Sequence, residues 1–245
     1  MNKISNLLIR KFQNSKFIRV IFKKVKILNE LYYKVKAEIA NKFLINNPPY
    51  NIQIHDQFIR TSWDPIRYGT LALALNTIRD ERIIGGIAEV GVFRGESSKI
   101  IHILAPEKKL YLFDTFEGFP SSFLENGDID NRFKDTRVEM VKRNIGDMTN
   151  VIIRKGVFPE TAKGLEEENF SLVYLDLDLY ISTLKALEFF YPKVPKGGFF
   201  YIHDYHNPTE SKAGVFRAVN EFMKHKSEKI IEVPDVLGSV IFRKI

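Results

Sequence analysis

Two short motifs of this 245-residue chain carry side chains that can bind a metal ion or move a proton. Asp176-Leu-Asp178 follows one apolar segment and His203-Asp204 follows the next. Asp176, His203 and Asp204 offer the oxygen and nitrogen ligands of a divalent cation such as Mg²⁺ or Mn²⁺. Asp178 or His203 can take a proton. A structural interpretation also stays open, in which Asp178 caps a helix, Asp204 ends its strand in a turn and His203 belongs to the core.

A second candidate is a ligand-binding loop within residues 87–98, where an apolar strand leads through two glycines into an amphipathic helix. Gly91 lets the backbone approach a ligand, and Gly95 lets the helix begin close to the strand. The G-x-x-x-G spacing differs from the G-x-G-x-x-G that cradles a pyrophosphate, so it favours a nucleoside cofactor without phosphates. A plain strand-to-helix turn is the alternative. The residues that we expect to line the cofactor cleft are Glu89, Gly91, Gly95 and Ser97.

Asp114 ends the next apolar segment, 19 residues after Gly95. At this position an acidic side chain typically accepts hydrogen bonds from the ribose hydroxyls of a nucleoside cofactor. The structural alternative is a helix cap or a salt bridge within the loop. The position after the glycine-containing strand favours the ribose contact.

These residues require a scaffold that brings the ends of several strands together. Asp64-Pro65 predicts a helix start, and Gly85-Gly86 predicts its end before the first strand. Apolar strands and amphipathic helices then alternate, which predicts an α/β fold with a mostly parallel sheet, helices on both faces and an antiparallel hairpin at one edge. The expected strands are 87–91, 109–113, 150–154, 171–175, 198–203, 229–233 and 238–243, and the expected helices are 96–104, 136–145, 181–191 and 212–225.

Charge divides the chain into an N-terminal arm, residues 1–49, and a domain, residues 50–245. The arm carries eleven lysines and arginines against Glu30 and Glu38, so the domain is left with 26 basic and 28 acidic residues. Because the excess charge belongs to the arm, no nucleic acid is expected across the domain. The pattern of the arm predicts an amphipathic helix or helix pair. It covers the domain or mediates a homo-oligomer, attaches peripherally to an anionic membrane, or, as the third alternative, binds nucleic acid. The chain has no cysteine, which excludes thiolate metal sites and fits a cytoplasmic location, including the inner face of the membrane.

Segments in the same order over residues 60 to 245 resemble the macrocin O-methyltransferase family. The resemblance implies a Rossmann-like, doubly wound fold with an antiparallel seventh strand, S-adenosylmethionine as cofactor and methyl transfer to a hydroxyl, often on a sugar. The segments that carry it are Tyr68-Gly-Thr-Leu71, 88–95, 110–118, 154–161, 175–183, Tyr191-Pro-Lys193, Gly197-Gly198, His203-Asp-Tyr205 and Gly238-Ser239.

Carried over residue by residue, Glu89, Gly91 and Gly95 match the family's cofactor loop. Asp114 matches the ribose acid, and Gly156 matches the turn beside the adenine. Asp176 matches the metal-binding acid after the fourth strand. His203-Asp204 stands where characterised members resemble Asp-Asp, so one expected acid is replaced by an imidazole, which favours a softer ion than Mg²⁺. We expect the metal to lower the pKa of the acceptor hydroxyl, with Asp176 as the pivot of the site.

Two other functions remain open from the sequence. A glycosyltransferase would use Asp176-Leu-Asp178 as a metal-binding D-x-D motif for a nucleotide sugar, and a catalytically silent scaffold would bind the cofactor only. If the chain is a methyltransferase, we expect its acceptor to be a small molecule or a glycan. We expect residues 115–135 and 205–211 to shape its pocket, because a loop as long as the first is typically a lid or binding loop.

Overall fold

The computed structural model describes residues 62, 64–124, 130–207 and 214–245, and within them Ile66–Ile245 forms one compact unit. The arm of residues 1–49 lies outside the described residues. The helices are α5 (Pro65–Asp80), α6 (Glu96–Leu104), α7 (Val138–Ile145), α8 (Tyr180–Phe190) and α9 (Gly214–Met223), with short 3₁₀ turns η1 (Ser121–Phe123), η3 (Glu160–Ala162) and η4 (Tyr191–Lys193). The strands are β1 (Gly86–Val90), β2 (Leu110–Asp114), β3 (Val151–Lys155), β4 (Phe170–Leu175), β5 (Phe199–Ile202), β6 (Ile231–Val233) and β7 (Ser239–Arg243).

The seven strands form one sheet in the order β3-β2-β1-β4-β5-β7-β6. Strands β1 to β5 pair in parallel, whereas β7 pairs antiparallel with both β5 and β6. The predicted α/β fold with an antiparallel edge hairpin is therefore confirmed. Most predicted boundaries differ from the structure by one or two residues. The first helix also ends earlier than Gly85-Gly86 predicted, because α5 ends at Asp80 and Gly86 already belongs to β1.

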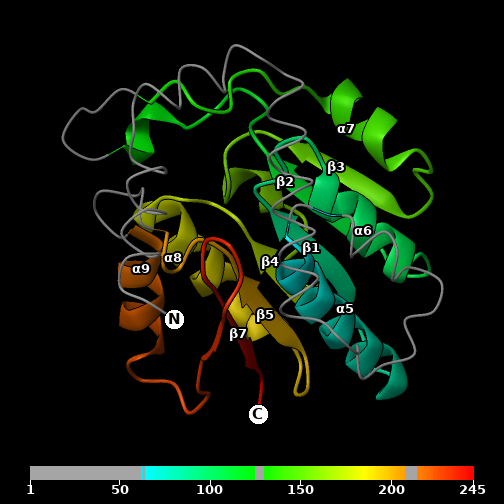
Figure 1. The fold of residues 1–245 in the computed structure, drawn as a ribbon, viewed down its shortest axis with the longest axis vertical. Helices are drawn as coiled ribbons and strands as arrows, with labels where there is room; N and C mark the ends of the chain where they lie inside the picture. The colour runs from blue at the N-terminus through cyan, green and yellow to red at the C-terminus, as the bar shows by residue number, and fades with distance from the viewer. Residues whose placement is uncertain (1–61, 63, 125–129, 208–213) are drawn as a thin grey trace, which may run out of the picture. The chain divides into compact units, whose positions relative to one another are not determined.

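Helices cover both faces of the sheet (Figure 1). Buried side chains of β1, β4 and β5 pack on one face against α8 and α9, in a core that includes Val90, Val173, Phe190 and Phe200. The opposite face carries Glu89 and Tyr174 and lies under α5 and α6, which contact these two residues through Arg67, Ser97 and Ser98. Coverage on both faces explains why the strands are almost continuously apolar.

The parallel ladder continues one residue beyond the strand ends, and this continuation builds the site. The backbone N–H of Asp176 donates to the Val90 carbonyl at 2.9 Å, and that of His203 donates to the Leu175 carbonyl at 2.8 Å. On the other side of β1, the Gly91 N–H donates to Phe113 at 2.9 Å. The first residues after β1, β4 and β5 are thus held side by side at one edge of the sheet.

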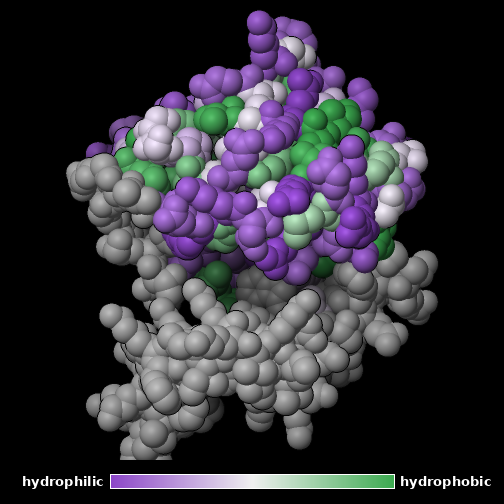
Figure 2. Space-filling model, turned by 90° about the horizontal axis from the view of Figure 1, so that it is seen from above, coloured by the Kyte–Doolittle hydropathy of each residue, from purple (hydrophilic) through white to green (hydrophobic). Residues whose placement is uncertain are grey.

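The surface of the described part and the apolarity of its helices indicate which kinds of contact it can make. Seen from above, its surface is largely hydrophilic, with hydrophobic residues in separate patches (Figure 2). No helix in the described ranges is both long and apolar enough to cross a membrane.

Candidate active site

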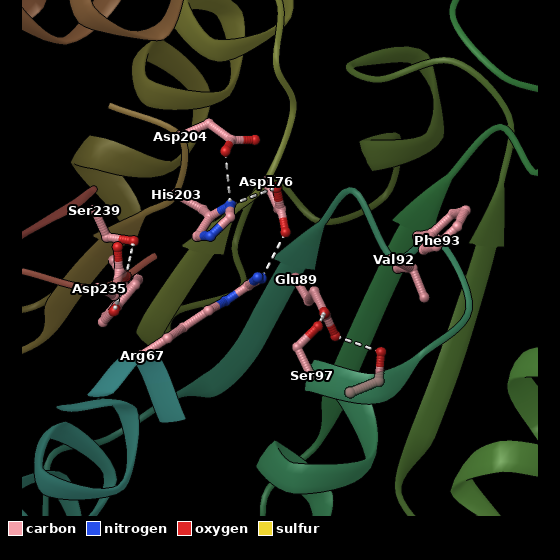
Figure 3. Close-up of polar contacts among 12 residues, drawn as sticks. Arg67, Glu89, Val92, Phe93, Ser97, Asp176, His203, Asp204, Asp235 and Ser239 are labelled. Carbon is pink, nitrogen blue, oxygen red and sulfur yellow. Dashed lines mark hydrogen bonds and ion pairs between the residues drawn. The ribbon is translucent and has the colours of Figure 1, made fainter. Parts of the chain in front are cut away.

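Asp176 lies at the centre of a buried chain of charged side chains (Figure 3). Its Oδ1 lies 3.1 Å from Nδ1 of His203, and its Oδ2 accepts a hydrogen bond of 2.6 Å from Nη2 of Arg67. The same His203 nitrogen lies 3.2 Å from Oδ1 of Asp204. The Asp176 side chain is 23% exposed, against 4% for Arg67 and 3% for His203, so Asp176 is the member that a ligand can reach most easily.

The structure brings together the three residues that the sequence singled out as metal ligands. One ligand atom from each of Asp176, His203 and Asp204 lies within 4.8 Å of the others. Asp204 has a left-handed backbone with φ 61°, and its Oδ1 also accepts a hydrogen bond of 3.0 Å from the Asn207 amide. Side-chain amide and imidazole together orient the Asp204 carboxylate toward the cluster.

Arg67 is the member of this site that sequence reasoning missed. It lies in the first turn of α5, on the same helical face as the buried Leu71, Leu75 and Ile78. Its guanidinium lies 5.4 Å from the ring centre of Tyr68 and 5.2 Å from that of Tyr174. The signal was present in the sequence, because an arginine that continues an apolar i, i+4 face needs a buried partner charge.

Neighbouring charges set the pKa values of Asp176 and His203. Burial would raise the pKa of the Asp176 carboxyl, but the positive charges of His203 and Arg67 lower it well below its usual range. Burial would lower the pKa of the His203 imidazole, but the Asp176 carboxylate raises it to about 10. His203 therefore holds a proton at neutral pH in this arrangement, and Nδ1 shares it with the two carboxylates.

Asp178 does not join Asp176 despite the short spacing between them. Among the described residues, the cluster of candidate ligands around Asp176 does not include it. Asp178 is 8% exposed and has a left-handed backbone with φ 59°, which turns the chain away from the strand direction. Leu179 occupies the N-cap position of α8, so Asp178 lies one residue before it, and a capping role of the Asp178 side chain stays a prediction.

Glu89 lies on β1, on the face covered by α6, and is fully buried. Ser97 and Ser98 of α6 both donate hydrogen bonds to its carboxylate oxygens (Figure 3). Burial raises the pKa of the Glu89 carboxyl to about 7, although the two serine hydroxyls oppose the rise. The predicted cofactor residues Glu89 and Ser97 are therefore direct partners, and their contact with a cofactor stays a prediction.

The two glycines of the loop after β1 allow different close contacts. Gly91 has φ 88°, and a Cβ there would lie 2.0 Å from the carbonyl oxygen of Asp176. Gly95 has φ 79° and caps α6, and a Cβ there would lie 2.9 Å from Val141 of α7. Gly91 thus permits the close approach of the β1 loop to Asp176, while Gly95 permits the packing of α7 against the start of α6.

Asp114 holds the same loop from the end of β2. Its Oδ2 accepts hydrogen bonds from the backbone N–H groups of Val92 at 2.8 Å and Phe93 at 2.9 Å, and its Oδ1 accepts one of 2.7 Å from Phe116. These contacts tie the loop after β1 to β2, and the expected ribose contact stays a prediction. Gly156 follows β3, where its N–H donates to the Asp114 carbonyl at 2.9 Å.

The long loop after β2 returns to the same region. Phe119 and Phe133 form edge-to-face contacts with ring centres 5.3 Å apart, and Phe133 makes a similar contact of 5.1 Å with Phe93. One end of the loop therefore packs onto the β1 loop through Phe133, and the other end packs onto Phe133 through Phe119. Residues 125–129 of this loop and residues 208–211 of the second expected acceptor segment lie outside the described residues.

Comparisons with known proteins agree with this geometry. Residues 61–244 match the family model described as Macrocin-O-methyltransferase (TylF). A protein of Streptomyces olivaceus, the 8-demethyl-8-(2,3-dimethoxy-alpha-L-rhamnosyl)-tetracenomycin-C 4'-O-methyltransferase, is 22% identical over 210 residues, which are 72% of this chain and 80% of that protein. The fold resembles the O-methyltransferase NovP with a TM-score of 0.64 at 20% identity, covering 89% of this chain and 98% of NovP. It also resembles the calicheamicin methyltransferase CalS11 with a TM-score of 0.58 at 19% identity, covering 85% and 91%.

Proposed function

The chain belongs to the macrocin O-methyltransferase family, and from this premise we propose that it transfers a methyl group from S-adenosylmethionine to a hydroxyl of a sugar or glycan. The family makes the chain an O-methyltransferase. The name of the Streptomyces olivaceus relative places the methyl group on a rhamnosyl unit of its substrate, which supports a deoxysugar acceptor. The glycosyltransferase alternative needs Asp178 beside Asp176, and the structure does not support that pairing.

The cofactor would lie along the loop after β1. S-adenosylmethionine carries two ribose hydroxyls, a sulfonium and an α-ammonium group and has no phosphate, so it needs hydrogen-bond acceptors rather than a phosphate cradle. Asp114 offers carboxylate oxygens beside the loop, and Glu89 offers a buried carboxyl group at its strand. Gly156 lies next to Asp114, at the position where the family resemblance implies the turn beside the adenine.

The observation that carries the proposal is the contact between Gly91 and Asp176. The absent Cβ of Gly91 is what lets the Asp176 carbonyl approach, so the cofactor loop and the charged cluster meet at one point of the sheet edge. Methyl transfer is an in-line displacement, which requires the acceptor oxygen and the methyl carbon about 3–3.5 Å apart before reaction. An acceptor hydroxyl bound by the accessible Asp176 side chain would lie beside the cofactor.

In the reaction, the carbon–sulfur bond breaks with its electrons left on sulfur, and the carbon–oxygen bond forms. The hydroxyl proton must leave as the acceptor oxygen becomes positively charged. His203 already holds a proton at neutral pH in the present arrangement, and the pKa of Asp176 is held well below its usual range. We propose that Asp176 accepts a hydrogen bond from the acceptor hydroxyl and that the proton passes on to solvent. The Arg67 and His203 charges orient Asp176 for this contact.

The metal ion expected from the sequence would be held by Asp176, His203 and Asp204. Their donor types suit a divalent cation, but both oxygens of Asp176 already bind the cationic groups of Arg67 and His203. The charges present do not fit a further cation at this carboxylate, so no step of the proposed reaction depends on one.

The test uses the purified full chain, S-adenosylhomocysteine and Asp176→Asn. We expect micromolar binding of S-adenosylhomocysteine by calorimetry, and transfer of a labelled methyl group to nucleotide-linked or glycosidic deoxysugars. Asp176→Asn should lower turnover by about 100-fold or more while the cofactor affinity changes little. Asp80→Asn, at the exposed end of α5, is the matched control. A fully active Asp176→Asn enzyme, or a chain that does not bind S-adenosylhomocysteine, would contradict the proposal.

Peripheral membrane contact through residues 1–49, oligomerisation and a cytoplasmic location stay predictions from the sequence. Liposome flotation of the full chain, compared with a chain that begins near Pro48, tests the first. Equal flotation of both proteins on anionic vesicles would contradict it.

A further inference from the structure

Arg67 occupies the place beside Asp176 that a divalent cation would need. The guanidinium binds Oδ2 of Asp176 at 2.6 Å, while His203 binds Oδ1 at 3.1 Å. A metal ion coordinated by either oxygen would lie about 2 Å from it and therefore close to a fixed positive charge. Arginine stays charged at every accessible pH, so this repulsion does not depend on the protonation of His203.

The Arg67 side chain is held too firmly to move aside without loss. It is 4% exposed and begins from the first turn of α5, whose neighbouring buried residues Tyr68 and Leu71 pack in the core. Its guanidinium lies near the rings of Tyr68 and Tyr174, which favour a cation. Displacement by a metal ion would break the buried ion pair between Arg67 and Asp176, which is strongly unfavourable.

The charge of the cluster leads to the same result. Arg67 places a permanent positive charge on Oδ2 of Asp176, and His203 occupies Oδ1. A divalent cation at Asp176 would therefore have to share this one carboxylate with two groups that already bind it. Sites for Mg²⁺ and Mn²⁺ instead gather oxygen ligands around the ion to offset its charge.

We propose that Arg67 is a positioning residue that takes the place of a divalent cation, fixing the Asp176 carboxylate for the acceptor and making the enzyme independent of added metal. This role rests on the proposed methyl transfer, but its exclusion of metal does not. Arg67 does not touch the reacting atoms in this account. It acts through Asp176, and removing it should convert the cluster into a metal site.

The experiment measures Mn²⁺ binding to the full chain by electron paramagnetic resonance, which needs neither cofactor nor acceptor. We expect the wild type to bind Mn²⁺ no more tightly than about 1 mM, and Arg67→Gln to bind it at least about tenfold more tightly. The double variant Arg67→Gln/Asp176→Asn should return to the wild-type value. Arg79→Gln, an exposed arginine on the same helix, is the matched control and should not change binding.

Two binding results would overturn the proposal: wild-type Mn²⁺ binding in the micromolar range that Asp176→Asn abolishes, or no gain of binding in a folded Arg67→Gln. Circular dichroism shows whether each variant folds. If Arg67→Gln does not fold, Mn²⁺ binding is compared between the wild type and Arg67→Lys. Both keep the positive charge, so both should exclude Mn²⁺. A second readout is the rate of methyl transfer by the wild type, which should be the same with and without a metal chelator. A rate that falls in chelator and returns when Mn²⁺ is added would overturn the proposal. Failure to bind S-adenosylhomocysteine would contradict only the proposed function, and the Mn²⁺ measurement would still test whether Arg67 excludes a metal ion.

Discussion

Replacing Glu89 by glutamine should change how the stability of the protein depends on pH. The Glu89 carboxyl is fully buried, and burial raises its pKa from 4.5 to about 7. Each pKa unit corresponds to about 1.4 kcal/mol, so ionised Glu89 costs the folded protein about 3 kcal/mol relative to the unfolded chain. Glutamine has nearly the same shape, keeps a hydrogen-bonding partner for Ser97 and Ser98, and has no proton to lose.

The sign follows from which state holds the proton more tightly. Because the folded pKa is above the unfolded value, the stabilising contribution of neutral Glu89 is complete below pH 4.5 and is lost as pH rises to about 7. The free energy of unfolding of Glu89→Gln should therefore rise, relative to the wild type, by about 2.5 kcal/mol between pH 5 and pH 8. His203, whose pKa is raised to about 10, loses its own stabilising contribution from pH 6.5 upwards, but equally in both proteins.

The assay is urea unfolding of the full chain, followed by far-ultraviolet circular dichroism at pH 5, 6, 7 and 8. Glu96→Gln replaces an exposed glutamate at the start of the same helix α6 and should give a curve parallel to the wild type. If the Glu89→Gln and wild-type curves also run parallel, within about 0.5 kcal/mol, the carboxyl is not held neutral by burial and the reasoning fails.

Two further predictions concern the loop after β1. Gly91→Ala should destabilise the fold by about 3 kcal/mol in the same urea assay, because its Cβ would lie 2.0 Å from the Asp176 carbonyl oxygen. The control Gly146→Ala has a similar φ of 85° but open space around it, so it should cost about 1 kcal/mol. Equal losses would show that the close approach at Gly91 is unimportant. Asp114→Ala should release the N–H groups of Val92 and Phe93 and weaken S-adenosylhomocysteine binding by at least about tenfold in calorimetry. An unchanged affinity in a folded variant would separate Asp114 from the cofactor site.

Much of the fold was readable from local patterns. Alternating apolar strands and amphipathic helices indicated a mostly parallel sheet, and the short connection before Gly238 indicated the antiparallel edge pair, both of which the structure confirms. The meeting of Asp176 with His203 and Asp204 could also be predicted, because parallel strands end at the same edge of a sheet. These inferences needed only chain order and side-chain periodicity.

The Asp-Leu-Asp motif shows where a local pattern stops being informative. In an extended chain, residues two apart point the same way, so the spacing favours a pair formed by Asp176 and Asp178. The left-handed backbone at Asp178 breaks this regularity, and the start of α9 packs there: a Cβ on Gly214 would lie 3.2 Å from the Asp178 carbonyl oxygen. The backbone conformation depends on this packing between distant segments, which spacing alone does not encode.

By itself, the sequence determined the order of the elements, the family and the set of polar residues at the strand ends, because each is written in local residue types. Only the tertiary structure decided how those residues are charged and paired. Arg67 meets Asp176 across 109 positions of sequence, and the Asp176 carboxylate keeps the proton on His203 against the effects of burial and of the Arg67 charge. Glu89 is likewise kept near neutrality by its depth under α6. Charge states and ion pairs depend on burial and distance, which exist only once the chain has folded.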